Sequence, residues 1–229
     1  MRKALLALTA CAFTHACHAL IIDDFTDGIT GGELTTAPGS GTDTAIDAAP
    51  TGVLFDTREW FLFEPVGTTG LAESSLDVNT TIGVLTFSND PDVTESAFEI
   101  SYTSLGEDLT DGGLNAVFEL DVFFSDVTPP DFATLTISVV DGDFDPPDTA
   151  SVDFDVAGTV SIAFADFAPT TDFTDITFVS VLVEAVGVDA PDILFDEFRT
   201  NVPEPATYAA IFGGLALALG VARRRRNVR

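Results

Sequence analysis

Apolar and polar residues alternate with a period of two through much of the middle of this chain. In residues 98–102, 118–122 and 135–139, single acidic, serine or threonine residues separate the apolar ones. Such alternation places apolar side chains on one face of a β-strand and polar side chains on the other. The three segments therefore predict strands with one buried face each.

Two more alternating segments, residues 152–156 and 160–164, are joined by Ala157-Gly158-Thr159. A short glycine-containing connection between two such runs favours a β-hairpin, so we predict that these strands pair with each other. Residues 176–186 are apolar at both parities, which is the pattern of a strand covered on both faces. We expect this strand at the centre of a sheet.

Weaker apolar runs predict further strands, and turn residues lie between them. These runs are residues 20–25, 60–63, 71–78, 82–87 and 193–198. Glycine, proline and aspartate clusters such as Asp111-Gly112-Gly113 mark turns, and no window sustains a helical period. The chain is therefore predicted to be all-β, with residues 20–201 forming a single β-sandwich of jelly-roll type. Residues 30–51 are expected to be an irregular surface loop.

The first and last of the weaker runs carry a resemblance. The segments Ile21-Ile22-Asp23-Asp24-Phe25 and Ile193-Leu194-Phe195-Asp196-Glu197-Phe198 resemble the paired first and last strands of secreted carbohydrate-binding jelly rolls. The resemblance implies that the two segments lie side by side in one sheet.

Residues 1–19 have the three parts of a secretory signal peptide. Arg2 and Lys3 give a positive start, residues 4–13 an apolar core, and Ala16-Cys17-His18-Ala19 a small-residue cleavage site. We expect cleavage after Ala19, with the Sec translocon as the export partner. An alternative stays open, because Leu8-Thr9-Ala10-Cys11 resembles a lipobox and would make Cys11 a lipidated first residue.

The other end of the chain, residues 202–229, has the features of a membrane-spanning segment. Residues 206–222 carry no charge and would extend about 25 Å as a helix, enough to cross the hydrocarbon core of a bilayer. The basic tail, residues 223–229, begins with four arginines that the positive-inside bias would hold in the cytoplasm. The segment before Pro203 is then expected outside.

This end resembles the PEP-CTERM sorting signal, which combines Pro-Glu-Pro, a transmembrane helix and an arginine cluster. The matching residues are Pro203, Glu204, Pro205, Arg223, Arg224, Arg225 and Arg226. The resemblance implies an exosortase, a membrane-embedded cysteine protease of Gram-negative bacteria that make extracellular polysaccharide. It further implies cleavage near the motif and delivery to the cell surface or matrix. An ordinary membrane anchor is the alternative, but it does not explain the Pro-Glu-Pro.

The composition of residues 20–201 excludes several classes of chemistry. All 37 acidic residues except Glu204 lie there, against Arg58 and Arg199 alone, and the segment has no cysteine, histidine, lysine or methionine. It therefore cannot hold a disulfide, a Ser-His-Asp triad, a histidine metal site or a Schiff-base lysine. Its negative charge repels nucleic acid and anionic lipid. The two arginines are expected to be counter-ions of nearby carboxylates.

Two groups of aspartates are candidate calcium ligands. Asp141, Asp143 and Asp145 alternate through a turn and Asp148 follows them. Carboxylates, backbone carbonyls and water can complete the oxygen shell that calcium prefers there. The alternative is a polar turn with local side-chain caps. Pairing of the terminal strands would gather a second group, which comprises Asp23, Asp24, Asp27 and Asp196.

Trp60, the only tryptophan, follows Arg58 and Glu59 and precedes an apolar run. An exposed indole beside these charges would be a platform for stacking a sugar, whereas a buried indole would be part of the core.

Together these features predict a secreted, non-enzymatic surface or matrix protein, with polysaccharide as the candidate ligand and calcium as the candidate cofactor. The alternative is a polysaccharide-acting enzyme, a glycosidase or lyase that uses an Asp/Glu pair. A third possibility is an adhesin that binds another surface protein. A deep groove lined by aromatic residues and two converging carboxylates would favour the enzyme, and a flat acidic surface would favour the structural protein.

Overall fold

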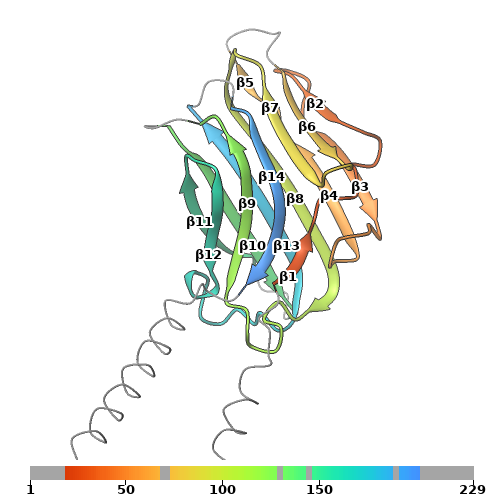
Figure 1. Cartoon of the computed structure of the whole chain (residues 1–229), viewed down its shortest axis with the longest axis vertical. Coiled ribbons are helices and arrows are strands. Elements are labelled where there is room, and N and C mark those ends of the chain that lie inside the picture. Colours follow the sequence, from red (N-terminus) through yellow and green to blue (C-terminus); the bar gives the residue numbers. More distant parts are fainter. Residues whose placement is uncertain (1–18, 68–72, 128–130, 143–145, 188–190, 202–229) are drawn as a thin grey trace, which may run out of the picture.

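The computed structural model describes residues 19–67, 73–127, 131–142, 146–187 and 191–201. Its strands form two seven-stranded sheets that face each other (Figure 1). Every strand pair in the described part of the chain is antiparallel. The predicted all-β sandwich is confirmed, and its jelly-roll type stays a prediction.

Sheet A has the order β12-β9-β14-β7-β6-β2, with β1 also paired to β14. Its strands are β1 (Leu20–Asp23), β2 (Leu34–Thr36), β6 (Ser74–Asn79), β7 (Val84–Asn89), β9 (Val117–Ser125), β12 (Gly158–Ala163) and β14 (Ile193–Asn201).

Sheet B has the order β11-β10-β13-β8-β4-β3, with β5 also paired to β8. Its strands are β3 (Asp43–Ala48), β4 (Thr57–Leu62), β5 (Val66–Gly67), β8 (Val93–Glu107), β10 (Ala133–Asp141), β11 (Asp148–Phe154) and β13 (Ile176–Val186). A single turn of 3-10 helix, η1 (Phe164–Asp166), follows β12.

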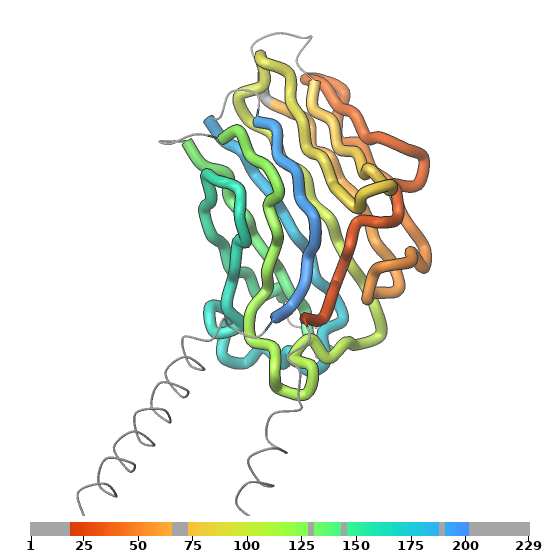
Figure 2. The backbone as a smooth tube through the Cα atoms, in the orientation of Figure 1, coloured from red at the N-terminus to blue at the C-terminus, as the bar shows by residue number. Residues whose placement is uncertain are grey.

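Strand β14 lies inside sheet A and brings the two ends of the described chain together. Strand β9 pairs with one edge of β14, and β7 and β1 follow each other along the other edge. Leu20 pairs with Thr200, so β1 begins where β14 ends, at the lower end of the molecule in Figure 2. The expected pairing of the first and last strands is confirmed. This lower end is called the base below.

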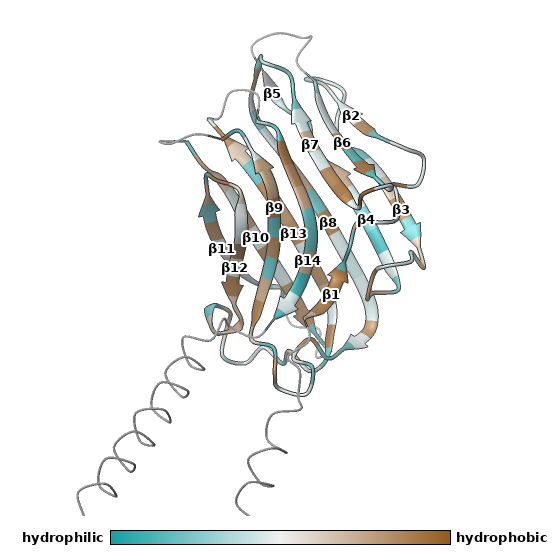
Figure 3. Cartoon of the chain, viewed as in Figure 1, coloured by the Kyte–Doolittle hydropathy of each residue, from teal (hydrophilic) through white to brown (hydrophobic). Residues whose placement is uncertain are grey.

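Alternation of apolar and polar residues is visible along the strands (Figure 3) and explains why they form. The predicted strands at 98–102, 118–122 and 135–139 lie within β8, β9 and β10. Strand β13 pairs with both β10 and β8, so its predicted central position is confirmed.

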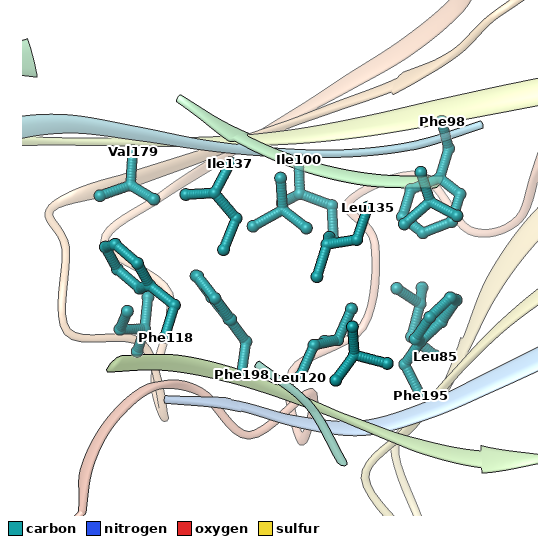
Figure 4. Close-up of a cluster of buried hydrophobic side chains, with 14 of the residues drawn as sticks. Leu85, Phe98, Ile100, Phe118, Leu120, Leu135, Ile137, Val179, Phe195 and Phe198 are labelled. Carbon is teal, nitrogen blue, oxygen red and sulfur yellow. The ribbon is translucent and has the colours of Figure 1, made fainter. Parts of the chain in front are cut away.

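The core fills the space between the sheets. Phe98, Ile100 and Ile137 of sheet B point toward Phe118 and Phe198 of sheet A (Figure 4), and all are at most 1% exposed. Their removal from water is the main stabilising contribution in a domain without disulfides.

The predicted hairpin between residues 152–156 and 160–164 is wrong. Strand β11 pairs with β10 in sheet B, whereas β12 pairs with β9 in sheet A. Both strands send apolar side chains into the same core, Phe154 from one layer and Ile162 from the other. Alternation indicates which face of a strand is buried but not which sheet the strand joins, and the short connection crosses between layers.

The expectation of an irregular loop at residues 30–51 is also wrong, because β2 and β3 lie there. Strand β3 has an inverted pattern: Ile46 is 60% exposed, whereas Asp47 faces inward and is 5% exposed. Apolar periodicity therefore cannot reveal it.

The two predicted targeting segments lie outside the described residues, apart from Ala19. Among the residues that the structure does describe, no helix has the length and apolar character needed to span a membrane. The signal peptide and the spanning helix at 206–222 remain predictions.

Candidate functional site

Arg58 lies in the core and joins the two sheets through an ion pair. Its side chain, from β4 of sheet B, is fully buried and donates from Nη1 to both carboxylate oxygens of Asp23 in β1 of sheet A, at 3.0 and 2.8 Å. It also contacts Asp47 of β3, with Nη2 3.1 Å from Oδ2. The Tyr102 hydroxyl donates to Asp23 Oδ2 at 3.0 Å. We call these four residues the core ion cluster.

Trp60 packs against this cluster. It is fully buried, its indole nitrogen donates to Asp47 Oδ2, and its ring centroid lies 4.5 Å from the Arg58 guanidinium carbon. The alternative prediction of an exposed sugar-stacking platform at Trp60 is therefore corrected. Trp60 occupies one of the buried alternate positions of β4, which places the indole in the core.

The pKa values in the core ion cluster move in opposite directions. Burial raises the pKa of Asp23 above its usual value, although the charge of Arg58 opposes the shift. Burial also acts to raise the pKa of Asp47, but hydrogen bonds from Thr30 and Trp60 outweigh it and the net shift is downward. Burial likewise raises the pKa of Tyr102 well above its usual range. Of the two carboxyls, Asp23 is therefore the one that takes up a proton more readily.

The second candidate calcium group is not assembled. Asp23 is committed to Arg58 and Tyr102, Asp24 accepts from Thr26 within its own turn, and Asp196 is exposed. In the described ranges of the chain, no three potential ligands are grouped in a way that could hold a metal. The prediction for Asp23, Asp24, Asp27 and Asp196 is corrected, because strand pairing does bring β1 beside β14 but the carboxylates take other partners.

Half of the first candidate calcium group can be located. Asp143 and Asp145 lie outside the described residues, whereas Asp141 ends β10 and Asp148 begins β11 at the base. Asp141 Oδ2 accepts from the backbone amide of Asp172 at 3.1 Å, and Asp148 accepts from the hydroxyl of Thr171. This calcium site stays a prediction.

Arg199 forms the second ion cluster, on the outer face of sheet A. Its Nε donates to Glu119 Oε2 at 2.9 Å, its Nη1 donates to Glu197 Oε1 at 2.8 Å, and Asp121 also binds the guanidinium group. The Arg199 side chain is 16% exposed and two of its carboxylate partners are 27% exposed. Burial acts to lower the pKa of Arg199, but hydrogen bonds to these carboxylates outweigh burial, and the net shift of the pKa is upward. The expectation that both arginines are counter-ions is confirmed.

The last two described residues are held at the base by a set of hydrogen bonds that we call the C-terminal clamp. Asn115 Nδ2 donates to Thr200 Oγ1 at 3.0 Å, and Thr200 Oγ1 donates to the carbonyl of Leu109 at 2.9 Å. Asn201 accepts from the amide of Ala116 at 2.9 Å through its carbonyl and donates through Nδ2 to Glu119 Oε2 at 3.0 Å. The clamp therefore consists of the hydrogen bonds that Thr200 and Asn201 form with Leu109, Asn115, Ala116 and Glu119.

Two polar hollows lie elsewhere on the described surface. One, of about 280 Å³, is lined by Asp27, Gly28, Thr30, Asp47, Ala48, Ala49, Pro50 and Arg58. The other, of about 210 Å³, is lined by Glu33, Glu73, Ser74, Ser75, Ser88, Asn89 and Asp90. Neither lining includes an aromatic residue, and the Asp47 carboxylate of the first hollow is already engaged by Arg58.

Exposed aromatic side chains occur instead on β9 of sheet A. Phe123 is 69% exposed and Phe124 is 45% exposed. Phe124 pairs across the strands with Leu194 of β14, and a register shift in β9 at this point leaves Phe123 without a directly opposed residue on β14. Rings presented in this way are available to a ligand.

Sequence reasoning missed the residues that do most of the positioning. Asp47 was hidden by the inverted pattern of β3, and Asn115 and Glu119 have no local signal that distinguishes them from other polar residues. Only the folded structure shows that Asn115 binds Thr200 and that Glu119 binds Asn201.

Comparison with known proteins identifies the C-terminal stretch. Residues 201–226 match the family model of the PEP-CTERM protein-sorting motif. The resemblance seen in Pro203, Glu204, Pro205 and the arginine cluster is thereby confirmed. The motif begins at Asn201, the residue that ends β14.

The remaining comparisons concern the sandwich. A family 11 carbohydrate-binding module of the cellulosomal cellulase Lic26A-Cel5E of Clostridium thermocellum is 10% identical, with 83% of this chain and 99% of that chain covered and a TM-score of 0.41. CBM28, a carbohydrate-binding module specific for non-crystalline cellulose, is 13% identical, with 81% and 96% covered and a TM-score of 0.43. Similarity at this level does not transfer a ligand or an activity. No curated protein matches the chain.

Proposed function

We propose that this chain is an exported surface or matrix protein that an exosortase processes at its PEP-CTERM motif, and that its sandwich is a non-enzymatic module. The observation that carries the proposal is the match of residues 201–226 to the sorting motif, directly after the last strand. The motif implies export and sorting at a membrane. The proposed destination is the cell surface or extracellular matrix of a Gram-negative bacterium.

The interior of the sandwich supports an extracellular role. Residues 20–201 have no cysteine, so their stability does not depend on the redox state of the compartment. A buried aromatic and aliphatic core and the core ion cluster hold the sheets together instead. The excess of carboxylates keeps the exported domain soluble and opposes pairing between sheet edges of different molecules.

Polysaccharide is the proposed ligand. The exposed rings of Phe123 and Phe124 offer apolar faces that can stack on sugar rings. This surface is an outward sheet face rather than a deep groove. It therefore favours binding over the alternative, a glycosidase or lyase with a converging Asp/Glu pair.

Processing can be tested in a host that expresses an exosortase, by following the full chain with pulse labelling. The wild-type chain should be shortened by loss of its C-terminal segment and released from the membrane fraction. A variant with alanine at Pro203, Glu204 and Pro205 should stay at full length in the membrane fraction. Equal behaviour of the two chains would contradict sorting by this motif.

Ligand binding can be tested on glycan arrays with the processed protein, in calcium and in a chelator. Binding that weakens on replacing both Phe123 and Phe124 by serine would support the proposed surface. Replacement of Phe61, which lies on the opposite sheet, is the matched control. A melting temperature that does not change on chelation would exclude calcium at Asp141, Asp143, Asp145 and Asp148.

A further inference from the structure

The sorting motif follows the folded sheet with almost no intervening chain. Asn201 is both the last residue of β14 and the first residue of the matched motif, and one residue, Val202, separates it from Pro203. An extended residue spans about 3.5 Å, so Pro203 can lie no more than roughly 7 Å from Asn201. The protease must therefore work next to the sandwich.

There is equally little chain on the other side of the motif. The uncharged run that is predicted to enter the membrane begins at Ala206, directly after Pro205. Residues 202–205 can extend over about 14 Å at most. The base of the sandwich, where β14 ends, is then the part that faces the membrane before cleavage.

The end of β14 is paired on both edges as well as clamped. Thr200 pairs with Leu20 of β1 on one side and with Phe118 of β9 on the other, and Asn201 pairs with Val117. Thr200 is fully buried. A protease cleft takes its substrate as an extended peptide whose backbone is free to form new hydrogen bonds. While the clamp is closed, the backbone of Thr200 and Asn201 is engaged in strand pairing and is not free in this way.

We propose that the C-terminal clamp controls access of the sorting protease to Pro203-Glu204-Pro205, so that Thr200 and Asn201 must detach from β9 before cleavage. This inference rests on the exosortase processing proposed above and adds the step that limits its rate. The folded domain is then a regulator of its own release from the membrane.

One feature of the clamp lowers the cost of opening it. Asn115 is 3% exposed, and its side-chain oxygen has no hydrogen-bond partner among the described residues. A buried acceptor without a partner destabilises the closed state, and opening returns it to water. The clamp is therefore closed by several hydrogen bonds yet includes one unfavourable group.

The decisive test lengthens the chain between the clamp and the motif. Insertion of Gly-Ser-Gly-Ser between Asn201 and Val202 adds about 14 Å of extended chain and leaves every clamp contact in place. In an exosortase-expressing host, the full chain with the insertion should be cleaved at least fivefold faster than the wild type. Cleavage of both at the same rate would overturn the proposal.

A point substitution tests the clamp itself. Thr200→Val removes the hydroxyl that joins Asn115 to Leu109, and the loss of both hydrogen bonds should speed cleavage at least about fivefold. Thr134→Val is the matched control, because it removes a hydroxyl that donates to Asp153 at 2.9 Å on sheet B, away from the base. The control should be cleaved at the wild-type rate. Equal acceleration by both substitutions would point to general destabilisation and contradict the clamp.

Combining the changes separates this inference from the proposed function. In the chain that carries the insertion, Thr200→Val should give no further acceleration, because the motif already reaches the protease. The variant with alanine at Pro203, Glu204 and Pro205 reports on sorting alone. If that variant is not cleaved but the insertion has no effect, the proposed role of the clamp is wrong and sorting by the motif stands. If that variant is cleaved like the wild type, the proposed sorting is itself wrong.

Discussion

The two arginines of residues 20–201 occupy opposite environments in the same sandwich. Arg58 is fully buried between the sheets with Asp23 and Asp47, whereas Arg199 lies partly exposed on the outer face of sheet A among Glu119, Asp121 and Glu197. Each carries the same charge in the same acidic chain. The difference between them therefore isolates what burial does to an ion pair.

Because Arg58 is buried, the loss of its ion-pair contacts should cost more stability than the loss of those of Arg199. A buried charge that loses its partner keeps its full desolvation cost, whereas a charge at the surface is compensated by water and salt. The core ion cluster is thus expected to determine whether the sheets stay together, and the Arg199 cluster to adjust the stability of one sheet.

The largest expected effect is that of Arg58→Met. It leaves Asp23 and Asp47 buried without a cation and should lower the free energy of unfolding by about 3–5 kcal/mol, measured by chemical denaturation. Arg58→Lys keeps the charge but loses the planar fork, and should be less damaging. A loss below 1 kcal/mol for Arg58→Met would contradict the role given to this cluster.

Arg199→Met is the matched comparison, because it changes the net charge of the chain by the same amount. We expect a loss of about 1–2 kcal/mol, since water can solvate Asp121 and Glu197, and Glu119 keeps its hydrogen bond from Asn201. Denaturation under identical conditions gives the difference directly. Equal losses for the two variants would remove the contrast between buried and exposed clusters.

The two carboxylates of the core ion cluster should respond to pH in opposite ways. The pKa of Asp23 is raised above 3.8 in the folded protein, so its contribution is complete below pH 3.8 and is lost as the pH rises through the folded pKa. The pKa of Asp47 is lowered, so its contribution is present above 3.8 and is lost as the pH falls through the folded pKa. The stability difference between wild type and Asp23→Asn should narrow with rising pH, and that for Asp47→Asn should narrow with falling pH. Parallel trends would refute the assignment.

A change of salt concentration should have the smallest effect on stability, and it should distinguish the exposed ion cluster from the buried one. Raising the ionic strength from 0.05 to 0.5 M screens the exposed pairs of Arg199, so the cost of Arg199→Met should fall by roughly 0.5 kcal/mol. The cost of Arg58→Met should change by less, because the Arg58 side chain is fully buried although it borders the first polar hollow. A similar decrease for both variants would show that the core ion cluster is accessible to solvent.

Much of the sandwich could be predicted because its strands follow one simple rule. Strands β8, β9, β10 and β13 present apolar residues to the core at every second position, and that pattern is visible without any tertiary information. The pairing of β11 and β12 could not be predicted in this way, since both face the same core from different sheets. Strand β3 was missed because its buried residue is the polar Asp47.

The same limit applies to the candidate sites. That Arg58 and Arg199 serve as counter-ions followed from their isolation in an acidic chain, but their partners did not. Asp23 lies 35 residues from Arg58, and Asp121 lies 78 residues from Arg199. The sorting motif could be recognised because its three parts are contiguous, whereas the C-terminal clamp depends on contacts across 82 to 91 residues.

The position of β14 also sets the order in which sheet A can be completed. Sheet A needs this strand between β9 and its two other neighbours, yet β14 is the last of its strands along the chain. Leu20 of the first strand has Thr200 of the last strand as its partner, so β1 cannot pair until β14 is in place. Long-range pairing of this kind is slow to form. The two ends of residues 20–201 must therefore meet before sheet A is complete, which makes closure of this sheet a late step of folding.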